Sequence, residues 1–329
     1  MSRARYVLGR IVQTIFLLWV ILTFLFFLFK LLPGDLASQL ALQGASEEYI
    51  EQFRENWGLN DPLHIQYIRF LTNFVTLDYG RSMRFNKPVL EFVRIRIFNS
   101  FILIAPALTL SYIIGAALGA VLGTKRGSRW EKFGIMPIII LGSIPGFFLA
   151  IILVVVFAGV LNWFPTSGMV GPTIANQYSD APWWRIYLTE SFAMHYVLPL
   201  ATIVLRYLYI PMLIMRTSVI EISGEDFSYY HKITGLPKLA RLKHVAKHGS
   251  LPVITNYPLS LGKAVGGLVL IEIVFNWPGI GFTLLQSVLQ RDLPTLRFVF
   301  FLIALVIVLG NFAVDLLYGY IDPRVSVAD

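Results

Sequence analysis

Residues 221–256 read EISGEDFSYYHKITGLPKLARLKHVAKHGSLPVITN, and this polar, basic stretch interrupts a chain that is otherwise mostly hydrophobic. Its first half places Phe227, Tyr230 and Ile233 on one face of a short predicted helix. Gly235, followed by Leu-Pro, indicates that this helix ends and that a second one begins.

The second half of the stretch predicts another amphipathic helix. Leu239, Leu242 and Val245 or Ala246 form its apolar stripe, basic residues cover its other faces, and Gly249 marks its end. Two short amphipathic helices joined by a glycine, with hydrophobic segments on both sides, predict a projection that docks in a groove of another subunit.

The chain around this stretch has the composition of a membrane protein. Of its 329 residues, 56% are hydrophobic and only 14% are charged, which lies outside the range of soluble globular domains. Several apolar runs reach the roughly 20 residues that cross a bilayer as a helix, and they lack the alternation of membrane strands. We therefore predict an all-α membrane protein with six transmembrane helices near residues 9–32, 99–123, 133–161, 195–215, 258–275 and 298–320.

The distribution of Lys and Arg predicts the topology. Positive residues gather before the first span, between the second and third, and between residues 216 and 247, so the positive-inside rule places both termini in the cytoplasm. This topology explains the net charge of +8 better than nucleic-acid binding does. The predicted parts are a cytoplasmic N-terminus with the first span (1–32), an extracytoplasmic helical cap (33–98), and a core of five spans (99–329) that includes the cytoplasmic loop 216–257.

Two further features concern the N-terminal third. The apolar run of residues 11–32 is longer than the core of a signal peptide, and we expect it to be a retained span. Within the cap, residues 46–57 predict an acidic amphipathic helix that Gly58 ends, and residues 62–74 predict a second helix. Loops of this length cross the membrane largely regardless of their charge, so the positive residues of the cap do not exclude an outer position. We expect the cap to cover the outer mouth of the protein.

Three motifs within or beside the spans predict local geometry. Gly115, Gly119 and Gly123 give one helix a flat face for close packing, which favours packing inside the chain over a subunit contact. Pro145 in SIPGFF predicts a bend, and the pattern favours a simple structural bend over one whose freed carbonyls line a pathway. The turn at residues 276–279, before a short amphipathic helix, is typical of a re-entrant gate or of an interfacial helix.

Enzymatic chemistry is not indicated. The sequence has no phosphate-binding loop, no His-Glu-x-x-His zinc pattern and no cysteine. His244 and His248 are spaced for a metal on one helix face, but a basic helix favours a solvated or docking face. We predict no catalytic residue and no metal site.

Charged and polar residues within the spans need a partner or water, because a lone ion at the bilayer centre costs at least about 2.5 kcal/mol. Arg206 is expected to pair with Asp315 or to line a pathway, and a buried pair that fixes helix register is the structural alternative. The candidates for a pathway or gate are Arg206, Glu272, Asn276, Pro278, Asn311 and Asp315.

Several motifs, in order along nearly the whole chain, resemble one protein family, the membrane-spanning permease subunits of ATP-binding-cassette importers. The resemblance is to the B-type subunit of dipeptide and oligopeptide transporters. The motifs are LPGD (32–35), GLNDPLHIQYIRFL (58–71), LDYGRS (77–82), KPV (87–89), SIPGFFLA (143–150), NWFPTSG (162–168), VFNWPGIG (274–281), RDLP (291–294) and NFAVDLLYGYIDPR (311–324).

This resemblance implies a type I importer permease fold in the inner membrane of the cell, with a set of partner proteins. These are a second homologous permease, two ATPase subunits that carry ATP and Mg²⁺, and an extracytoplasmic solute-binding protein, whereas this chain binds no cofactor. The opening stretch corresponds to the coupling segment that docks on the ATPase. The residues expected to couple are Glu225, Asp226, Tyr230, Gly235, Leu236, Leu239 and Leu242. Where the family usually has small residues before the glycine, this chain has Tyr229, Tyr230 and His231, which implies an altered cleft on its ATPase.

The resemblance favours peptides as the transported solute, with oligosaccharides or nickel as alternatives. A secondary transporter driven by an ion gradient would need paired acids or inverted repeats, for which the isolated Glu272 and Asp315 give little support. For an intramembrane enzyme, the candidate catalytic groups would be limited to His195, Arg206 and Asp315.

Overall fold

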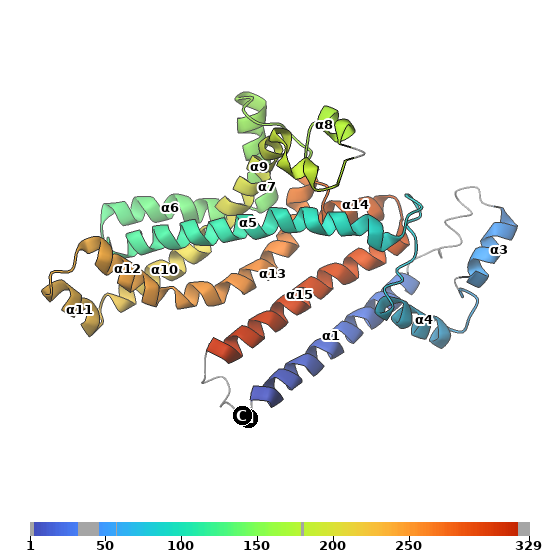
Figure 1. The fold of residues 1–329 in the computed structure, drawn as a ribbon, viewed down its shortest axis with the longest axis horizontal. Helices are drawn as coiled ribbons and strands as arrows, with labels where there is room; N and C mark the ends of the chain where they lie inside the picture. The colour runs from blue at the N-terminus through green and yellow to red at the C-terminus, as the bar shows by residue number, and fades with distance from the viewer. Residues whose placement is uncertain (1–2, 32–45, 57, 179–180, 322–329) are drawn as a thin grey trace. The chain divides into compact units, whose positions relative to one another are not determined.

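The structure is a computed structural model, and it describes residues 3–31, 46–56, 58–178 and 181–321. The described chain is built of helices joined by turns and by longer loops (Figure 1). Some of the sequence motifs are not covered by these residues. The LPGD motif and the last three residues of the 311–324 motif lie outside the described residues.

The helices follow the hydrophobic segments of the sequence. Their bounds are α1 Arg3–Leu31, α3 Glu47–Asn56, α4 Leu63–Val75, α5 Val89–Gly123, α6 Arg129–Ser143, α7 Gly146–Leu153, a π-helix Val154–Val160, α8 Pro172–Gln177, a 3₁₀ helix Arg185–Leu188, α9 Glu190–Tyr207, α10 Tyr209–Ile222, α11 Asp226–Ile233, α12 Lys238–Gly249, α13 Leu251–Val274, α14 Ile280–Leu289 and α15 Leu293–Ile321. Both helices expected within the cap are present as α3 and α4, and both helices expected within the polar stretch are present as α11 and α12.

Five helices or helix pairs in the described chain are long and apolar enough to cross a membrane, and a sixth span results if one bent pair is counted. That pair is α6 with α7 and its π-helical extension, and the two halves meet at 105°. The expected bend at Pro145 is therefore a break. Ile144 is extended (ψ 133°), and proline lacks the N–H that would continue the ladder of α6.

The chain divides into two compact units. Unit 1 contains the described residues up to 96 together with residues 283–312, and unit 2 contains residues 97–282 and 313–321. In unit 1, Leu22, Leu25 and Phe29 of α1 belong to one buried cluster with Phe74 of α4 and Phe301 of α15. This unit has its own hydrophobic core.

A buried carboxylate organises the loops of unit 1. Asp292, just before α15, accepts hydrogen bonds from the Ser82 hydroxyl (2.5 Å), the Met83 amide (3.1 Å) and the Thr295 hydroxyl (2.8 Å). Asp292 is 3% exposed. The LDYGRS and RDLP motifs are therefore two halves of one hydrogen-bonded corner.

Unit 2 has two buried clusters. The larger one joins α5, α7, α9 and α13, with Trp277 and Phe275 among its most buried side chains. The smaller one joins α5, α10, α12 and α13 around Met215, Val219 and Val245. α11 and α12 lie at one end of this unit, away from α8 (Figure 1).

The glycine stripe of α5 packs inside the chain, as expected. A Cβ at Gly115 would lie 2.6 Å from the carbonyl oxygen of Leu208, and one at Gly119 would overlap the carbonyl oxygen of Met212. Gly123 is equally close to Val219. The stripe thus lets the backbones of α5 and α10 touch, and the prediction of intrachain packing is confirmed.

Candidate functional site

The turn between α11 and α12 has the geometry that its sequence predicts. α11 ends at Ile233, and Gly235 adopts φ +71°. The amide of Leu236 donates to the carbonyl of His231 (3.2 Å), which is the long hydrogen bond of a Schellman helix end. Pro237 then precedes the first residue of α12. A side chain at Gly235 would meet no other atom within 4 Å, so this glycine is needed for its conformation rather than for space.

α12 is fixed to α10 by close packing. Val245 is 5% exposed within the cluster that contains Met215 and Val219, and Leu242 packs against this cluster. At Gly249 a Cβ would lie 3.1 Å from Cβ of Ser218. Because α13 begins two residues later at Leu251, α12 is attached closely to both α10 and α13.

The projection, defined as α11, α12 and the turn between them, carries an uncovered apolar surface. The exposed fractions of Tyr230, Ile233 and Leu239 are 64%, 66% and 78%. Leu236 is half-buried, and Glu225 and Asp226 are exposed at the start of α11. The side chains of Phe227 and Tyr229 lie outside the described residues. Three large apolar side chains on a basic projection form a surface suited to a partner protein.

Two of the histidines of the projection form a contact between its two helices. The rings of His231 and His244 meet edge to face, with centroids 5.1 Å apart. His248 is exposed on α12. No group of three or more His, Cys, Asp or Glu side chains suited to a metal occurs within the described residues.

Glu272 serves the turn after α13. Its side chain is fully buried. It accepts hydrogen bonds from the Ser100 hydroxyl (2.5 Å) and from the Phe282 amide (3.0 Å). Ser100 in turn accepts from the Ile280 amide (2.8 Å). A carboxylate at the start of α14 satisfies free amides and complements the helix dipole, so Glu272 acts as a cap supplied by another helix.

Asn99 holds the other side of the same turn. Its side-chain amide donates to the carbonyl of Pro278 (2.7 Å), and its backbone carbonyl accepts from the indole of the fully buried Trp277 (2.9 Å). The Tyr187 hydroxyl donates to the Asn99 side chain (2.5 Å). Asn276 is exposed, with φ +50°. The turn at residues 276–279 is therefore pinned to α5. The sequence reasoning missed Asn99 and Ser100, although two adjacent polar residues inside a span were a visible signal.

Arg206 lies at the break between α6 and α7. Its guanidinium donates to the carbonyl of Gly142 (2.5 Å), and its Cζ lies 5.6 Å and 5.9 Å from the ring centres of Tyr207 and Tyr209. The Gly142 carbonyl belongs to the last turn of α6, which has lost its in-helix donors. In these contacts Arg206 caps the last turn of a broken helix, which is neither of the roles that the sequence predicted for it, and its place in a pathway stays a prediction.

The remaining candidates lie on α15 and α13. Asn311 is exposed and Asp315 is half-buried, four residues apart on α15. The sequence reasoning also passed over Lys263, a lysine in the middle of α13 that is exposed in this chain. Nothing more than its position within an apolar run was needed to find it.

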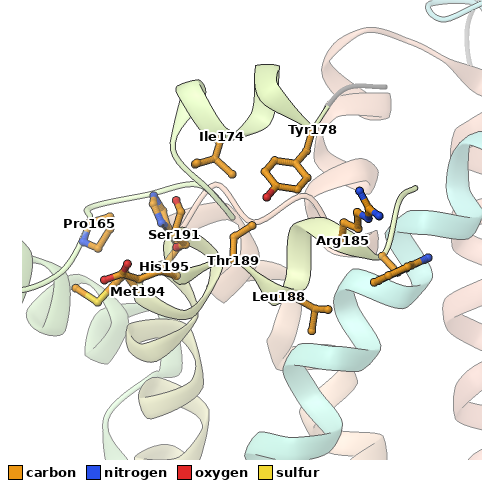
Figure 2. A pocket seen from close by; sticks show the side chains of 11 residues that line it. Pro165, Ile174, Tyr178, Arg185, Leu188, Thr189, Ser191, Met194 and His195 are labelled. Atoms are coloured by element: carbon orange, nitrogen blue, oxygen red, sulfur yellow. Dashed lines mark hydrogen bonds between the residues drawn. The ribbon is translucent and has the colours of Figure 1, made fainter. Parts of the chain in front are cut away.

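A hollow of about 800 Å³ opens in unit 2 where α8, the 3₁₀ helix and the start of α9 meet. Figure 2 shows His195 and Met194 on one side of it and Arg185 and Tyr178 on the other. Nδ1 of His195 lies 2.7 Å from the carbonyl of Ser191, so this nitrogen is hydrogen-bonded to the backbone of α9. The lining mixes apolar side chains with a cation, a carboxylate and hydroxyls, and among these described residues no nucleophile is hydrogen-bonded to a base.

Comparison with known protein families gives two matches. Residues 115–327 match the family described as "Binding-protein-dependent transport system inner membrane component". Residues 3–95 match the corresponding N-terminal family of the same transport systems. Together they cover both the projection and the cap.

Curated relatives match over almost the full length. The "Probable peptide ABC transporter permease protein y4tP" of Sinorhizobium fredii is 32% identical over 97% of this chain and 98% of its own length. The "Oligopeptide transport system permease protein AppB" of Bacillus subtilis is 31% identical over 98% and 99%. The "Glutathione transport system permease protein GsiC" of Escherichia coli K12 is 31% identical over 97% and 98%.

Proposed function

The chain belongs to the family of binding-protein-dependent transport system inner membrane components, and we propose that it forms half of a peptide translocation pathway and transmits ATP-driven movement to it. It is a multi-pass permease subunit of an ATP-binding-cassette importer in the inner membrane. The peptide class rests on the relatives, whose names specify peptides, oligopeptides or glutathione.

The structure of the projection is the main support for the coupling role. Its apolar surface is exposed at Tyr230, Ile233 and Leu239, while α12 is locked to α10 through Val245 and Gly249. A surface of this kind fits a groove on an ATPase subunit, and the rigid attachment passes the movement of that subunit to the spans. The basic flanks favour a groove with an acidic rim.

The assembly that completes this function has four further parts. A second, homologous permease supplies the other half of the pathway, two ATPase subunits bind ATP and Mg²⁺, and a solute-binding protein delivers the peptide from outside. Both termini and the projection then lie in the cytoplasm, in agreement with the positive charges of residues 216–247. ATP hydrolysis takes place on the partner subunits.

A matched pair of substitutions tests the docking surface. Leu239→Asp places a charge on the projection, and Leu188→Asp places the same charge on a leucine of equal exposure (78%) beside the hollow of Figure 2. We expect Leu239→Asp to weaken co-purification of the ATPase by about 2 kcal/mol, roughly thirtyfold, because an unpaired carboxylate would be buried in an apolar interface. Leu188→Asp should leave it unchanged.

Uptake in proteoliposomes that contain the whole importer separates this function from its rivals. ATP-dependent peptide uptake that Leu239→Asp abolishes supports the proposal. Uptake that continues without any ATPase subunit would instead identify a transporter driven by an ion gradient. ATP-dependent uptake of an oligosaccharide or of nickel, but not of peptides, would retain the coupling role and refute the peptide class.

A further inference from the structure

Lys263 lies in the middle of the candidate span Leu251–Val274, which begins seven residues before the start that the sequence predicted. It follows Leu251 by 12 residues and precedes Val274 by 11 within α13. At 1.5 Å per residue, these intervals are about 18 Å and about 16 Å. Half of a hydrocarbon core is about 15 Å, which is more than the four-carbon stem of a lysine can bridge by reaching toward either surface. The ammonium group therefore needs water or an anion at its own depth.

The face of α13 that carries Lys263 is not covered by the other described helices of unit 2. Leu259, Lys263, Gly266 and Leu270 are all exposed and follow one another at helical spacing. The buried residues of α13, among them Ala264 and Leu268, point to the other side. A Cβ at Gly262 or Gly266 would meet no atom within 4 Å. Within the described residues, Lys263 has no hydrogen bond and no ion pair.

Exposure of this face to lipid is unfavourable. A lysine at the centre of the bilayer costs at least about 2.5 kcal/mol on insertion scales. Two glycines beside the lysine leave a shallow surface in which a thin, extended ligand can lie along the helix. Apolar side chains at both ends of the stripe and one cation in its middle match a peptide, which carries apolar groups and a free carboxylate.

We propose that Lys263 faces the translocation pathway and binds the carboxylate of the transported solute as it crosses the membrane. The stripe of Leu259, Gly266 and Leu270 forms the wall on either side of it. This inference rests on the proposed peptide-importer function and adds to it a residue that contacts the solute. It also predicts that solutes without an anionic group cross more slowly.

The chain has no cysteine, and so Lys263→Cys introduces a single thiol that reports on this position. In the assembled importer without ATP, we expect the thiol to react with water-soluble methanethiosulfonate reagents, because these attack only hydrated thiols. Leu259→Cys on the same face should also react. Ala264→Cys, at a position 3% exposed, should not. Unreactive Lys263→Cys beside reactive Leu259→Cys would overturn the inference and place Lys263 against lipid or the second permease.

The same variant tests the charge. Trialanine uptake by Lys263→Cys should fall about tenfold relative to wild type, since a charge-assisted hydrogen bond is lost. The 2-aminoethyl reagent restores a cation and should restore uptake, whereas the 2-sulfonatoethyl reagent adds an anion and should not. Lys263→Arg should keep uptake near the wild-type rate. Co-purification of the ATPase subunits with each variant in the wild-type amount shows that the complex is assembled.

The two proposals fail in different ways. Undiminished trialanine uptake by Lys263→Cys, or equal recovery with both reagents, would overturn the role of Lys263 while leaving the importer function intact. Absence of ATP-dependent trialanine uptake by the wild type would count against the peptide class and, with it, against the carboxylate as the ligand. The labelling result would still decide whether Lys263 lies in a water-filled pathway.

Discussion

Two glycine turns, one before α12 and one after α13, use glycine for opposite reasons. Gly235 has a positive φ and open space around it, whereas Gly279 lies against the buried Glu272 and Ser100. The first turn leaves apolar side chains exposed, and the second is held by buried polar groups. The turn that we propose to dock on a partner is thus stabilised little by its own chain, while the turn after α13 is stabilised almost entirely by it.

Gly279→Ala is the strongest way to break this comparison. The added methyl group would overlap the Glu272 carboxylate and would lie 2.5 Å from the Ser100 hydroxyl. We expect a loss of about 3 kcal/mol or more in unfolding free energy, because overpacking and disruption of a buried charged network combine. Thermal unfolding of the purified complex measures it. The control is Gly310→Ala, at a position with open space, and equal stability of the two variants would show that the turn is not pinned.

Glu272→Gln tests the polar half of the same turn. The substitution keeps the shape, but it replaces one of the two acceptor oxygens with a donor, so that either Phe282 N–H or the Ser100 hydroxyl loses its partner. A buried unsatisfied donor costs about 1–3 kcal/mol. We expect the unfolding temperature to fall, but by less than it falls in Gly279→Ala. A fall in solute uptake with unchanged stability would instead support a pathway role for Glu272.

Gly235→Ala should act through backbone conformation alone. An L-residue with φ near +71° is strained by about 1–2 kcal/mol, and nothing surrounds the new methyl group. We expect faster amide hydrogen exchange in α11, with little change in α13. Gly235→Asn should show a smaller effect, because asparagine tolerates this conformation better. Faster exchange throughout α13 would show that the projection is part of the global folding unit.

Leu239→Ser is the smallest perturbation of stability in this series. The side chain is 78% exposed and packs little against its own chain, so the change in unfolding free energy should stay within about 0.5 kcal/mol. Recovery of the ATPase with the purified permease should fall nonetheless. A destabilised permease would mean that Leu239 packs within the projection, and the exposed surface would then be smaller than described.

Local sequence patterns predicted the parts of this fold that depend on neighbours in the chain. The two helices of the projection, their glycine turn and the turn at residues 276–279 follow from helix periodicity and from stop signals. The glycine stripe of α5 was also assigned correctly to packing inside the chain. At Pro145 the pattern predicted a bend, but the 105° angle of the break depends on contacts that lie outside the motif.

The polar candidates show where sequence reasoning ends. Glu272 was selected as a pathway residue because a lone acid in a span is costly, yet its partner Ser100 lies 172 positions away. Arg206 meets a backbone carbonyl 64 positions away, and a carbonyl group has no signature in the sequence. Both residues satisfy groups that became unpaired at a helix start or a helix break. Lys263, in contrast, was visible in the sequence and stands out only because the other described helices of unit 2 leave its face uncovered.

The sequence by itself determined the membrane class, the positions of the spans and the helix–glycine–helix form of the projection, because hydrophobicity and backbone preference are local properties. Only the tertiary structure decided which polar residues support the fold and which face outward. A buried charge must find its partner wherever the chain brings one, and this depends on the packing of helices distant in sequence. The same packing left Tyr230, Ile233 and Leu239 uncovered on the projection and Lys263 uncovered on α13.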